Sequence, residues 1–283
     1  MINKKNQRRS LILLAIATII AIQFSACREK CRDLITEEVS ITDKIRGVIV
    51  EGPWQVVVTQ DSNYNSAVLE YCVSKKTKVS AQLLPNGYLH IRLSLSGNNY
   101  HDHDFRVNIQ ATSLEKIEVS GAAEVYPYGH FYSLGEISLS GASNVYGLMG
   151  EGNFAKIKLS GASSLQILRF DGNNIDADIS GASQAYWGIN VRRCSVNCSG
   201  ASIFYGDGYA EETSFTGSGA SNLKTFDLES ENLDIDLSGA SIAEVTVNNT
   251  IKGRVTGAST LKYRKATNVD VLSQGASTVM RVN

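Results

Sequence analysis

One tetrapeptide recurs along this chain at nearly constant spacing. Ser-Gly-Ala-Ser, or a close variant, occurs nine times, at intervals of 18 to 20 residues. The residue that opens each copy, here called position zero, is in turn Ser120, Ser140, Ser160, Ser180, Ser199, Ser218, Ser238, Thr256 and Gln274. A unit of this size cannot bury its apolar face alone, so stacking of neighbouring units must supply the core.

The residues around each copy alternate between apolar and polar. Positions −3 and −1 are mostly apolar, as in Ile157 and Leu159, while position −2 is mostly polar, as in Lys158. This period of two predicts a strand. Glycine then turns the chain because it alone accepts a positive φ freely, and a second strand follows with an inward residue at +5. Two strands, one fixed turn and one variable loop per unit predict a parallel β-helix.

Charges offer an independent test of this stacking. In-register coils place the same position of adjacent coils side by side, ~4.8 Å apart. Position −4 reads Lys116, Glu136, Lys156, Asp176, Ser195, Ser214, Asp234, Lys252 and Asp270, with no like charges adjacent. Opposite charges across a ladder contribute roughly 0.2–1 kcal/mol each. Left-handed β-helices use a hexapeptide period and near-constant coils, so one motif per coil and variable coil length favour the right-handed form.

The first residues predict an export signal. Lys4, Lys5, Arg8 and Arg9 precede an apolar run of 12 residues, Leu11 to Ile22, which is too short to span a bilayer but suits a signal peptide. Phe24-Ser25-Ala26-Cys27 resembles the lipobox of bacterial lipoproteins. That resemblance implies cleavage after a 1–26 signal, diacylation of Cys27, and membrane attachment through residues 27–43 as a polar tether. Arg28 in place of Asp fits delivery to the outer membrane. The alternative is an ordinary secretory signal cleaved near Ala26.

Residues 44–115 lack the tetrapeptide but are also rich in strand patterns. The stretch from Val48 to Val56 resembles a degenerate coil with Glu51-Gly52 at its turn, and His90 to Gly97 gives another alternation ending in Ser96-Gly97. Two further strands are expected between them, with a hairpin-type turn at 85–87. We interpret 44–115 as longer, irregular coils preceding the repeat at 116–283. A separate small β domain is the alternative.

These features together resemble a known family. The opening IRGVIVEGPWQVVVTQ, the middle LHIRLSLSG and the run SLEKIEVSGAAEV with its repeated LSGAS coils are similar to the putative auto-transporter adhesin, head GIN domain family of Bacteroidetes envelope proteins. The resemblance covers about residues 40–283. It implies a β-helical, lipid-anchored or secreted envelope protein, and it brings no catalytic residues.

Cysteines and histidines provide few candidate sites. Cys194 and Cys198 lie ~13 Å apart on one strand, too far for a disulfide, so we expect buried free thiols. Cys31 and Cys72 are a candidate disulfide in an oxidising envelope. His101-Asp-His103-Asp has the residue types of a zinc site, but a solvated loop is the favoured interpretation, and we expect no metal and no cofactor.

Composition and motifs argue against an enzyme or a nucleic-acid-binding protein. The formal net charge is −1, and four basic residues lie in the signal, so the body offers no basic footprint for nucleic acid. Asp176/Asp178 and Asp234/Asp236 resemble carboxylate pairs of polysaccharide-cleaving enzymes, but each faces opposite charges in a neighbouring coil. The serines at zero and +3 have no nearby histidine to activate them, which favours a stacked hydroxyl ladder.

Position +6 carries the remaining candidate site. It faces outward and reads Tyr126, Tyr146, Gln166, Tyr186, Tyr205, Lys224, Glu244, Lys262 and Met280, with Trp187 and Tyr128 expected beside it. Exposed tyrosines suit contacts with a glycan or protein at the cell surface, although stacking that merely stabilises the sheet also explains them. The sequence therefore predicts a non-enzymatic envelope lipoprotein that acts as an adhesin or binding module. A scaffold without a ligand is the alternative, and a polysaccharide-active enzyme comes third.

Overall fold

The computed structural model describes residues 34–61, 63–72, 77–95 and 105–283. These residues form nineteen β-strands and no helix. The strands are β1 Leu34–Glu38, β2 Gly47–Glu51, β3 Gln55–Gln60, β4 Ser66–Cys72, β5 Thr77–Leu83, β6 Tyr88–Leu95, β7 Phe105–Ala111, β8 Lys116–Ser120, β9 Glu124–Tyr128, β10 Glu136–Leu139, β11 Asn144–Leu159, β12 Ser164–Ile179, β13 Gln184–Cys198, β14 Ile203–Gly217, β15 Asn222–Leu237, β16 Ile242–Val255, β17 Thr260–Lys265, β18 Asn268–Ser273 and β19 Thr278–Arg281. No helix in the described part of the chain is therefore long and apolar enough to cross a membrane.

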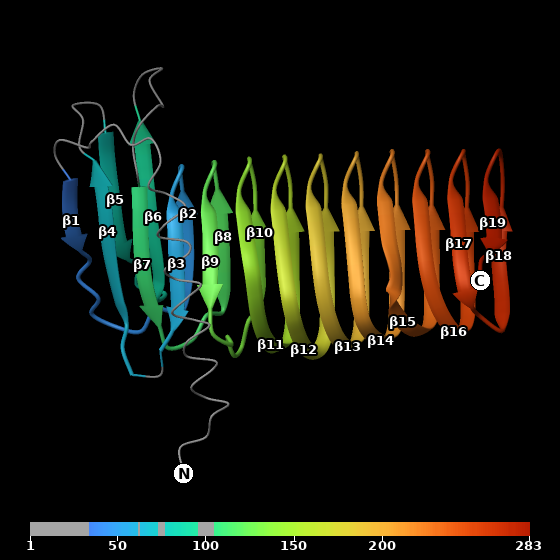
Figure 1. The fold of residues 1–283 in the computed structure, drawn as a ribbon, viewed down its shortest axis with the longest axis horizontal. Coiled ribbons are helices and arrows are strands. Elements are labelled where there is room, and N and C mark those ends of the chain that lie inside the picture. The colour runs from blue at the N-terminus through green and yellow to red at the C-terminus, as the bar shows by residue number, and fades with distance from the viewer. Residues whose placement is uncertain (1–33, 62, 73–76, 96–104) are drawn as a thin grey trace, which may run out of the picture.

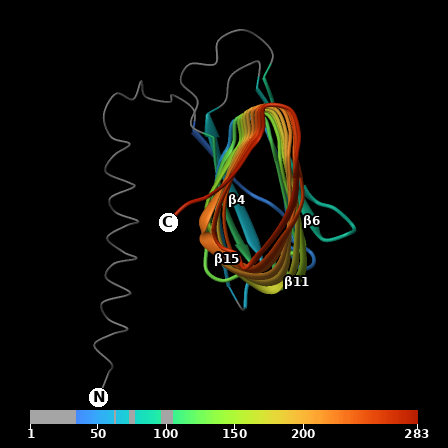
Figure 2. The same ribbon diagram turned by 90° about the vertical axis from the view of Figure 1, so that its right-hand side faces the viewer.

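The chain winds into an elongated solenoid (Figure 1), and its coils superimpose as a flattened ring when seen end on (Figure 2). Each coil has two sides. The post-turn sheet contains β9, the first halves of β11 to β16, β17 and β19, and the pre-turn sheet contains β8, β10, the second halves of β11 to β16, and β18. The repeated tetrapeptide makes one corner, called the turn, and the second bend makes the other. The predicted parallel β-helix is confirmed, while its hand stays a prediction.

The register of the coils is the one that the tetrapeptide predicts. Ile137 pairs with Ile117 on one side and Ile157 on the other, and Glu136 lies between Lys116 and Lys156 in the same way. The apolar −3 and −1 rows are buried throughout β8 to β16, with exposures of 2% or less among residues such as Leu159 and Cys198. The core is thus a set of apolar columns that run along the solenoid axis.

Glycine at the turn serves two physical needs at once. Gly161 has a φ of 75° and Gly181 one of 72°, a region that L-residues with a side chain enter only at a cost. A Cβ added to Gly161 would also lie 2.5 Å from the carbonyl oxygen of Gly141. Because the glycines stack on one another along the axis, no other residue type fits this column.

The serine at +3 is buried in every coil from Ser143 to Ser259. Its hydroxyl bonds to a neighbour in the next coil or to a carbonyl group: Ser163 Oγ lies 3.2 Å from Ser183 Oγ, and Ser202 Oγ donates to the Ile179 carbonyl at 3.1 Å. A buried hydroxyl is costly unless it is hydrogen-bonded. The predicted hydroxyl ladder is therefore confirmed at +3, where it closes the inside of the turn.

The second bend differs from expectation. The pattern predicts a variable loop in each coil, but β11 to β16 run through this bend as unbroken strands of 14 to 16 residues. Register shifts, such as those between Ile167 and Phe170 and between Tyr205 and Asp207, take up the variation in coil length. An extra residue in a strand is accommodated as a bulge, so a loop is unnecessary.

The N-terminal end of the solenoid does not follow chain order. β2 pairs in parallel with both β6 and β8, and β3 with both β7 and β9. The coil formed by β2 and β3 therefore stacks directly on β8 and β9, although residues 61–115 separate them in sequence. β4 then joins β7, β1 joins β4, and β5 joins β6, all antiparallel. These strands cover the end of the stack, which leaves fewer unpaired strand edges.

The sequence predicts three turns in this region, and two of them lie on described residues. Glu51 pairs with Ser120, and Gly52 has a φ of 111°, so Glu51-Gly52 occupies the turn as expected. Arg92, rather than Ser96, pairs with Glu51. β6 continues past this turn position to Leu95. Ser96-Gly97 lies outside the described residues, so the turn expected there stays a prediction. The hairpin turn at 85–87 is confirmed by the antiparallel pairing of β5 with β6.

Candidate functional site

The tyrosine row, defined as Tyr126, Tyr146, Gln166, Tyr186 and Tyr205, lies on the outer face of the post-turn sheet. The rings of Tyr186 and Tyr205 stack with centroids 4.5 Å apart and planes 5° from parallel, and those of Tyr126 and Tyr146 stack at 5.2 Å and 22°. Gln166 pairs with Tyr186 in register. Adjacent coils therefore hold two aromatic stacks in one line, separated by a single amide side chain.

Two hydroxyl groups of the row form hydrogen bonds with side chains two residues earlier in the same strand. Tyr186 donates to Gln184 Oε1 at 2.9 Å, and Tyr126 donates to Glu124 Oε2 at 3.0 Å. Partial burial, followed by the neighbouring Tyr205, raises the pKa of Tyr186. These phenols stay protonated at neutral pH, and their oxygen lone pairs remain available as acceptors. Tyr186 is 37% exposed, so the row offers ring edges and oxygens to a ligand.

The row ends in a charged segment. Lys224 Nζ lies 5.0 Å from the centre of the Tyr205 ring and donates to its hydroxyl oxygen at 3.3 Å. Beyond it, Lys262 Nζ and Glu244 Oε1 form an ion pair at 3.0 Å. A cation over the ring face stabilises the stack electrostatically, so Lys224 closes the second aromatic pair at one end.

Trp187 does not belong to this outer face, which corrects the sequence-based expectation. Its side chain is 2% exposed, and its indole packs edge-on against Phe204 with centroids 4.7 Å apart. Trp187 is at +7, and strand alternation turns it inward from its neighbour Tyr186. Tyr128, at +8, is half-buried and on the outer side.

The pre-turn sheet carries the carboxylate pairs, and Asp234/Asp236 has the oppositely charged partners that the ladder interpretation predicts. Asp236 is held by Arg254 through two bonds of 2.9 and 2.7 Å, and this contact lowers the pKa of Asp236. Asp234 lies 3.7 Å from Lys252 Nζ. Asp178 accepts from Asn197 Nδ2 at 3.3 Å. Asp236, with its pKa lowered in this way, stays ionised and does not provide the protonated acid that glycoside cleavage requires.

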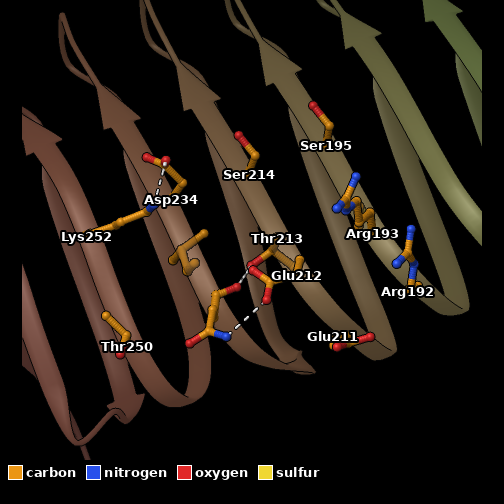
Figure 3. Close-up of a pocket in the computed structure, with 13 residues that line it drawn as sticks. Arg192, Arg193, Ser195, Glu211, Glu212, Thr213, Ser214, Asp234, Thr250 and Lys252 are labelled. Carbon is orange, nitrogen blue, oxygen red and sulfur yellow. Dashed lines mark hydrogen bonds and ion pairs between the residues drawn. The ribbon is translucent and has the colours of Figure 1, made fainter.

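A shallow groove of about 670 Å³ crosses this sheet from β13 to β16 (Figure 3). Arg192 and Arg193 stand at one end and Lys252 at the other, with short side chains such as Ser214 between them. Asn232 Nδ2 donates to Glu212 Oε1 at 3.1 Å, which ties one carboxylate of the groove. Both signs of charge are present, so the groove has no strong preference for an anion or a cation.

A second hollow, here called the aromatic cleft, lies at the second bend where the segment 129–135 meets β11 and β12. It has a volume of about 680 Å³ and is lined by Tyr132, Ser133, Leu134, Gly135, Glu151, Gly152, Asn153, Phe154, Asp171, Gly172 and Asn173. Sequence reasoning missed this site because its residues come from three coils whose second bend was expected to be loop. Tyr132 and Phe154, two aromatic residues near the second bend, are the sequence feature that could have indicated the site. The pattern did not give the register of the coils at this bend, so it could not bring the two residues together.

The remaining predicted sites divide into described and undescribed residues. Cys194 and Cys198 are free and buried, as predicted, and burial raises the pKa of each thiol to about 12. Cys72 is disulfide-bonded. Cys27, Cys31 and the 101–104 cluster lie outside the described residues. Among the residues that the structure does describe, no group of three His, Cys, Asp or Glu side chains is arranged to hold a metal ion.

Comparison with known proteins supports the fold and the family. Residues 45–266 match the family described as "Putative auto-transporter adhesin, head GIN domain". No curated protein matches the chain. A putative adhesin from Parabacteroides distasonis superimposes with a TM-score of 0.62 at 16% identity, covering 88% of this chain and 97% of its own. A putative adhesin from Parabacteroides merdae gives 0.59 at 15%, covering 89% and 97%. A putative lipid binding protein from Parabacteroides distasonis gives 0.59 at 12%, covering 89% and 98%.

Proposed function

We propose that this chain, which belongs to the putative auto-transporter adhesin, head GIN domain family, is a non-enzymatic adhesin anchored by lipid to the outer membrane. The observation that carries the proposal is the tyrosine row, a line of outward aromatic side chains on a rigid sheet. Tyrosine provides large contact area at low entropic cost. Two of the similar solved structures are described as putative adhesins and a third as a putative lipid binding protein, which agrees with a binding role.

The geometry of the row suits an extended ligand. The rings of Tyr186 and Tyr205 are parallel, with centroids 4.5 Å apart, and both present their edges outward. The coils repeat at ~4.8 Å along the axis. A glycan chain or an exposed protein segment laid along the axis would meet these edges and the phenol oxygens in succession. Each contact is weak, so useful adhesion depends on many copies presented on one cell surface.

The position of the proposed lipid anchor is compatible with presenting the tyrosine row away from the membrane. β1 begins at Leu34, seven residues after Cys27, and seven residues span at most ~25 Å. β1 also lies at the N-terminal end of the solenoid (Figure 1). A lipid on Cys27 would therefore hold that end near the membrane, while the coils with the tyrosine row lie further along the rod.

The anchor is tested by metabolic labelling with a palmitate analogue. The wild-type chain should be labelled and released only by detergent, whereas Cys27→Ser should be unlabelled. Equal labelling of the two chains would exclude the lipoprotein. Protease treatment of intact cells then distinguishes a surface-exposed rod, which is cleaved, from a periplasmic one, which is protected.

The row is tested with beads that carry residues 28–283 on surfaces coated with polysaccharide or glycoprotein. Tyr186→Ser with Tyr205→Ser should reduce bead retention several-fold and change the melting temperature little. Tyr186→Phe with Tyr205→Phe is the matched control, because it preserves the stack and removes only the hydroxyls. If stability falls and retention does not, the row is structural and the scaffold function is correct.

A further inference from the structure

The aromatic cleft is shaped by the one segment that breaks the regular second bend between β8 and β16. Residues 129–135 connect β9 to β10 and form no strand of their own. Their pairing with β11 includes one isolated parallel bridge, Phe131 with Gly150, and a bond from Leu134 N to Glu151 O at 3.1 Å. Ser133 has a φ of 65°, which is uncommon for a residue other than glycine. Such backbone strain concentrates at ligand sites, and here it lies next to the exposed Tyr132.

Two aromatic rings are left half-exposed at the cleft. Tyr132 is 50% exposed and Phe154 is 45% exposed, and both line the same hollow. The ring of His130 packs beside that of Tyr132, with centroids 5.1 Å apart. Large exposed apolar groups that gather in a concave place mark interaction sites, and an aromatic face with a polar surround suits a ligand that has both an apolar and a hydroxylated side.

The floor of the cleft is bare backbone. Gly152 pairs with Gly172 in the adjacent coil. A Cβ on Gly152 would lie 2.4 Å from the Leu134 carbonyl oxygen, and one on Gly172 would lie 2.2 Å from the Gly152 carbonyl oxygen. Side chains at these two positions are therefore excluded by the stacking of the coils, so that the hollow is lined there by backbone alone.

Polar groups with both donor and acceptor capacity surround this floor. Asn173 Nδ2 donates to Asn153 Oδ1 at 2.5 Å, which leaves the Asn153 amino group and the Asn173 oxygen for other partners. Asp171 is fixed by Arg169 and by Asn190, and the bond from Arg169 lowers the pKa of Asp171. Its carboxylate is thus ionised and held in place as an acceptor.

We propose that the aromatic cleft binds a neutral pyranose ring of a glycan. The C–H face of such a ring packs on Tyr132 or Phe154, and its vicinal hydroxyls bond to the amides of Asn153 and Asn173 and to Asp171. The lining includes the carboxylates of Asp171 and Glu151 and no lysine or arginine, and Arg169 offsets only the first of them. The cleft therefore offers no cation to a uronic or sialic acid, and its charge selects for neutral sugars. This is a site additional to the tyrosine row, and it stands independently of which ligand the row contacts.

The test is a printed glycan array probed with residues 28–283. The wild-type chain should bind a subset of the neutral glycans, and Phe154→Ser and Tyr132→Ser should each weaken that binding about tenfold. Phe154→Trp should retain binding, because it preserves an aromatic face. Tyr209→Ser is the matched control, since Tyr209 is 39% exposed at the same bend, two coils away, and outside the cleft.

Each contrary outcome is decisive. An array on which the wild-type chain binds no neutral glycan, or only acidic ones, overturns the proposal. Binding that survives Phe154→Ser and Tyr132→Ser but is lost in the Tyr186→Ser/Tyr205→Ser variant assigns the glycan to the tyrosine row, which would preserve the adhesin function and reject the cleft. Melting curves of the same variants establish that the losses do not come from unfolding, because both aromatic side chains are half-exposed.

Discussion

The regular coils and the N-terminal end use the same two sheets but reach them by different routes. From β8 onward, each coil stacks on the coil that precedes it in the chain. At the N-terminal end, the coil of β2 and β3 lies between β6–β7 and β8–β9, so chain order and spatial order differ. Both regions share a positive-φ glycine at the turn and apolar columns in register. The glycine turn and the apolar columns therefore determine which coils stack. The stacking order matches the chain order only where no additional strands, such as β4 to β7, intervene in the sequence.

The strongest way to break the regular region is to place a charge in its core. Leu159 is 1% exposed in the −1 column between Leu139 and Ile179. Leu159→Asp should abolish the cooperative melt of the regular coils, because an unpaired buried charge costs several kcal/mol. Leu272→Asp is the control: Leu272 is 55% exposed in the last coil and should tolerate the change. A Leu159→Asp melt within a degree or two of wild type would contradict the assigned inward face.

A second prediction asks whether the N-terminal insertion is needed for stacking or only for covering the end. Replacing residues 62–114 by a seven-residue linker, the length of the 129–135 connection, would leave β2 and β3 directly before β8 and β9. We expect the solenoid to persist by circular dichroism but to self-associate in size-exclusion chromatography, because the outer edges of β2 and β3 lose β6 and β7. A stable monomer would mean that the edge needs no cover, and loss of β-structure would mean that stacking itself depends on the insertion.

The cysteines differ between the two regions as well. Cys72 in β4 is disulfide-bonded, whereas Cys194 and Cys198 in β13 are free and buried. With those two free, and Cys27 assigned to the lipid, we predict the Cys31–Cys72 pairing. Cys31→Ser with Cys72→Ser should lower stability by about 2–4 kcal/mol, and peptide mapping without reductant should recover the linked pair. Cys198→Ala is the control that leaves the disulfide in place. Recovery of Cys72 as a free thiol would reject the pairing.

The contrast between the periodic coils and the N-terminal strands also explains how much of the structure can be predicted from the sequence. The tetrapeptide predicts the register of β8 to β19, the burial of Leu159 and the outward tyrosines, because a fixed period places each residue beside its counterpart. It does not predict the order of β2, β3, β6 and β7, since those pairings join segments without a period. The prediction that Trp187 lies beside the outward Tyr186 is wrong, because strand alternation turns the side chain at +7 inward.

The aromatic cleft shows the limit most clearly. Phe154 and Asp171 come together only because β11 and β12 continue through the second bend in register, as the pairing of Glu151 with Asp171 shows. Turn chemistry at the tetrapeptide is local and visible in the sequence. The opposite bend has no shared residue type, so its course depends on packing across coils. Sites at that bend can therefore be recognised only once the three-dimensional register of the coils is known.

The smallest predicted effect concerns the charge ladder on the regular pre-turn sheet. Arg254 donates from Nε and Nη2 to the two carboxylate oxygens of Asp236, and this contact lowers the pKa of Asp236 below its ordinary value of 3.8. A lowered folded pKa means that the stabilisation is complete above the unfolded value near 3.9 and is lost as pH falls through the folded pKa. Because both side chains are well exposed, Arg254→Ala should lower the melting temperature by only about a degree at pH 7.

That difference should remain constant down to about pH 5, shrink below about pH 4, and diminish in high salt because exposed pairs are screened. Thermal melts of wild type and Arg254→Ala across this range provide the measurement. A difference that stays constant through pH 4 and below would mean that Arg254 stabilises the sheet by packing of its stem, because packing does not depend on the ionisation of Asp236. The ladder would then be a consequence of register rather than a source of stability.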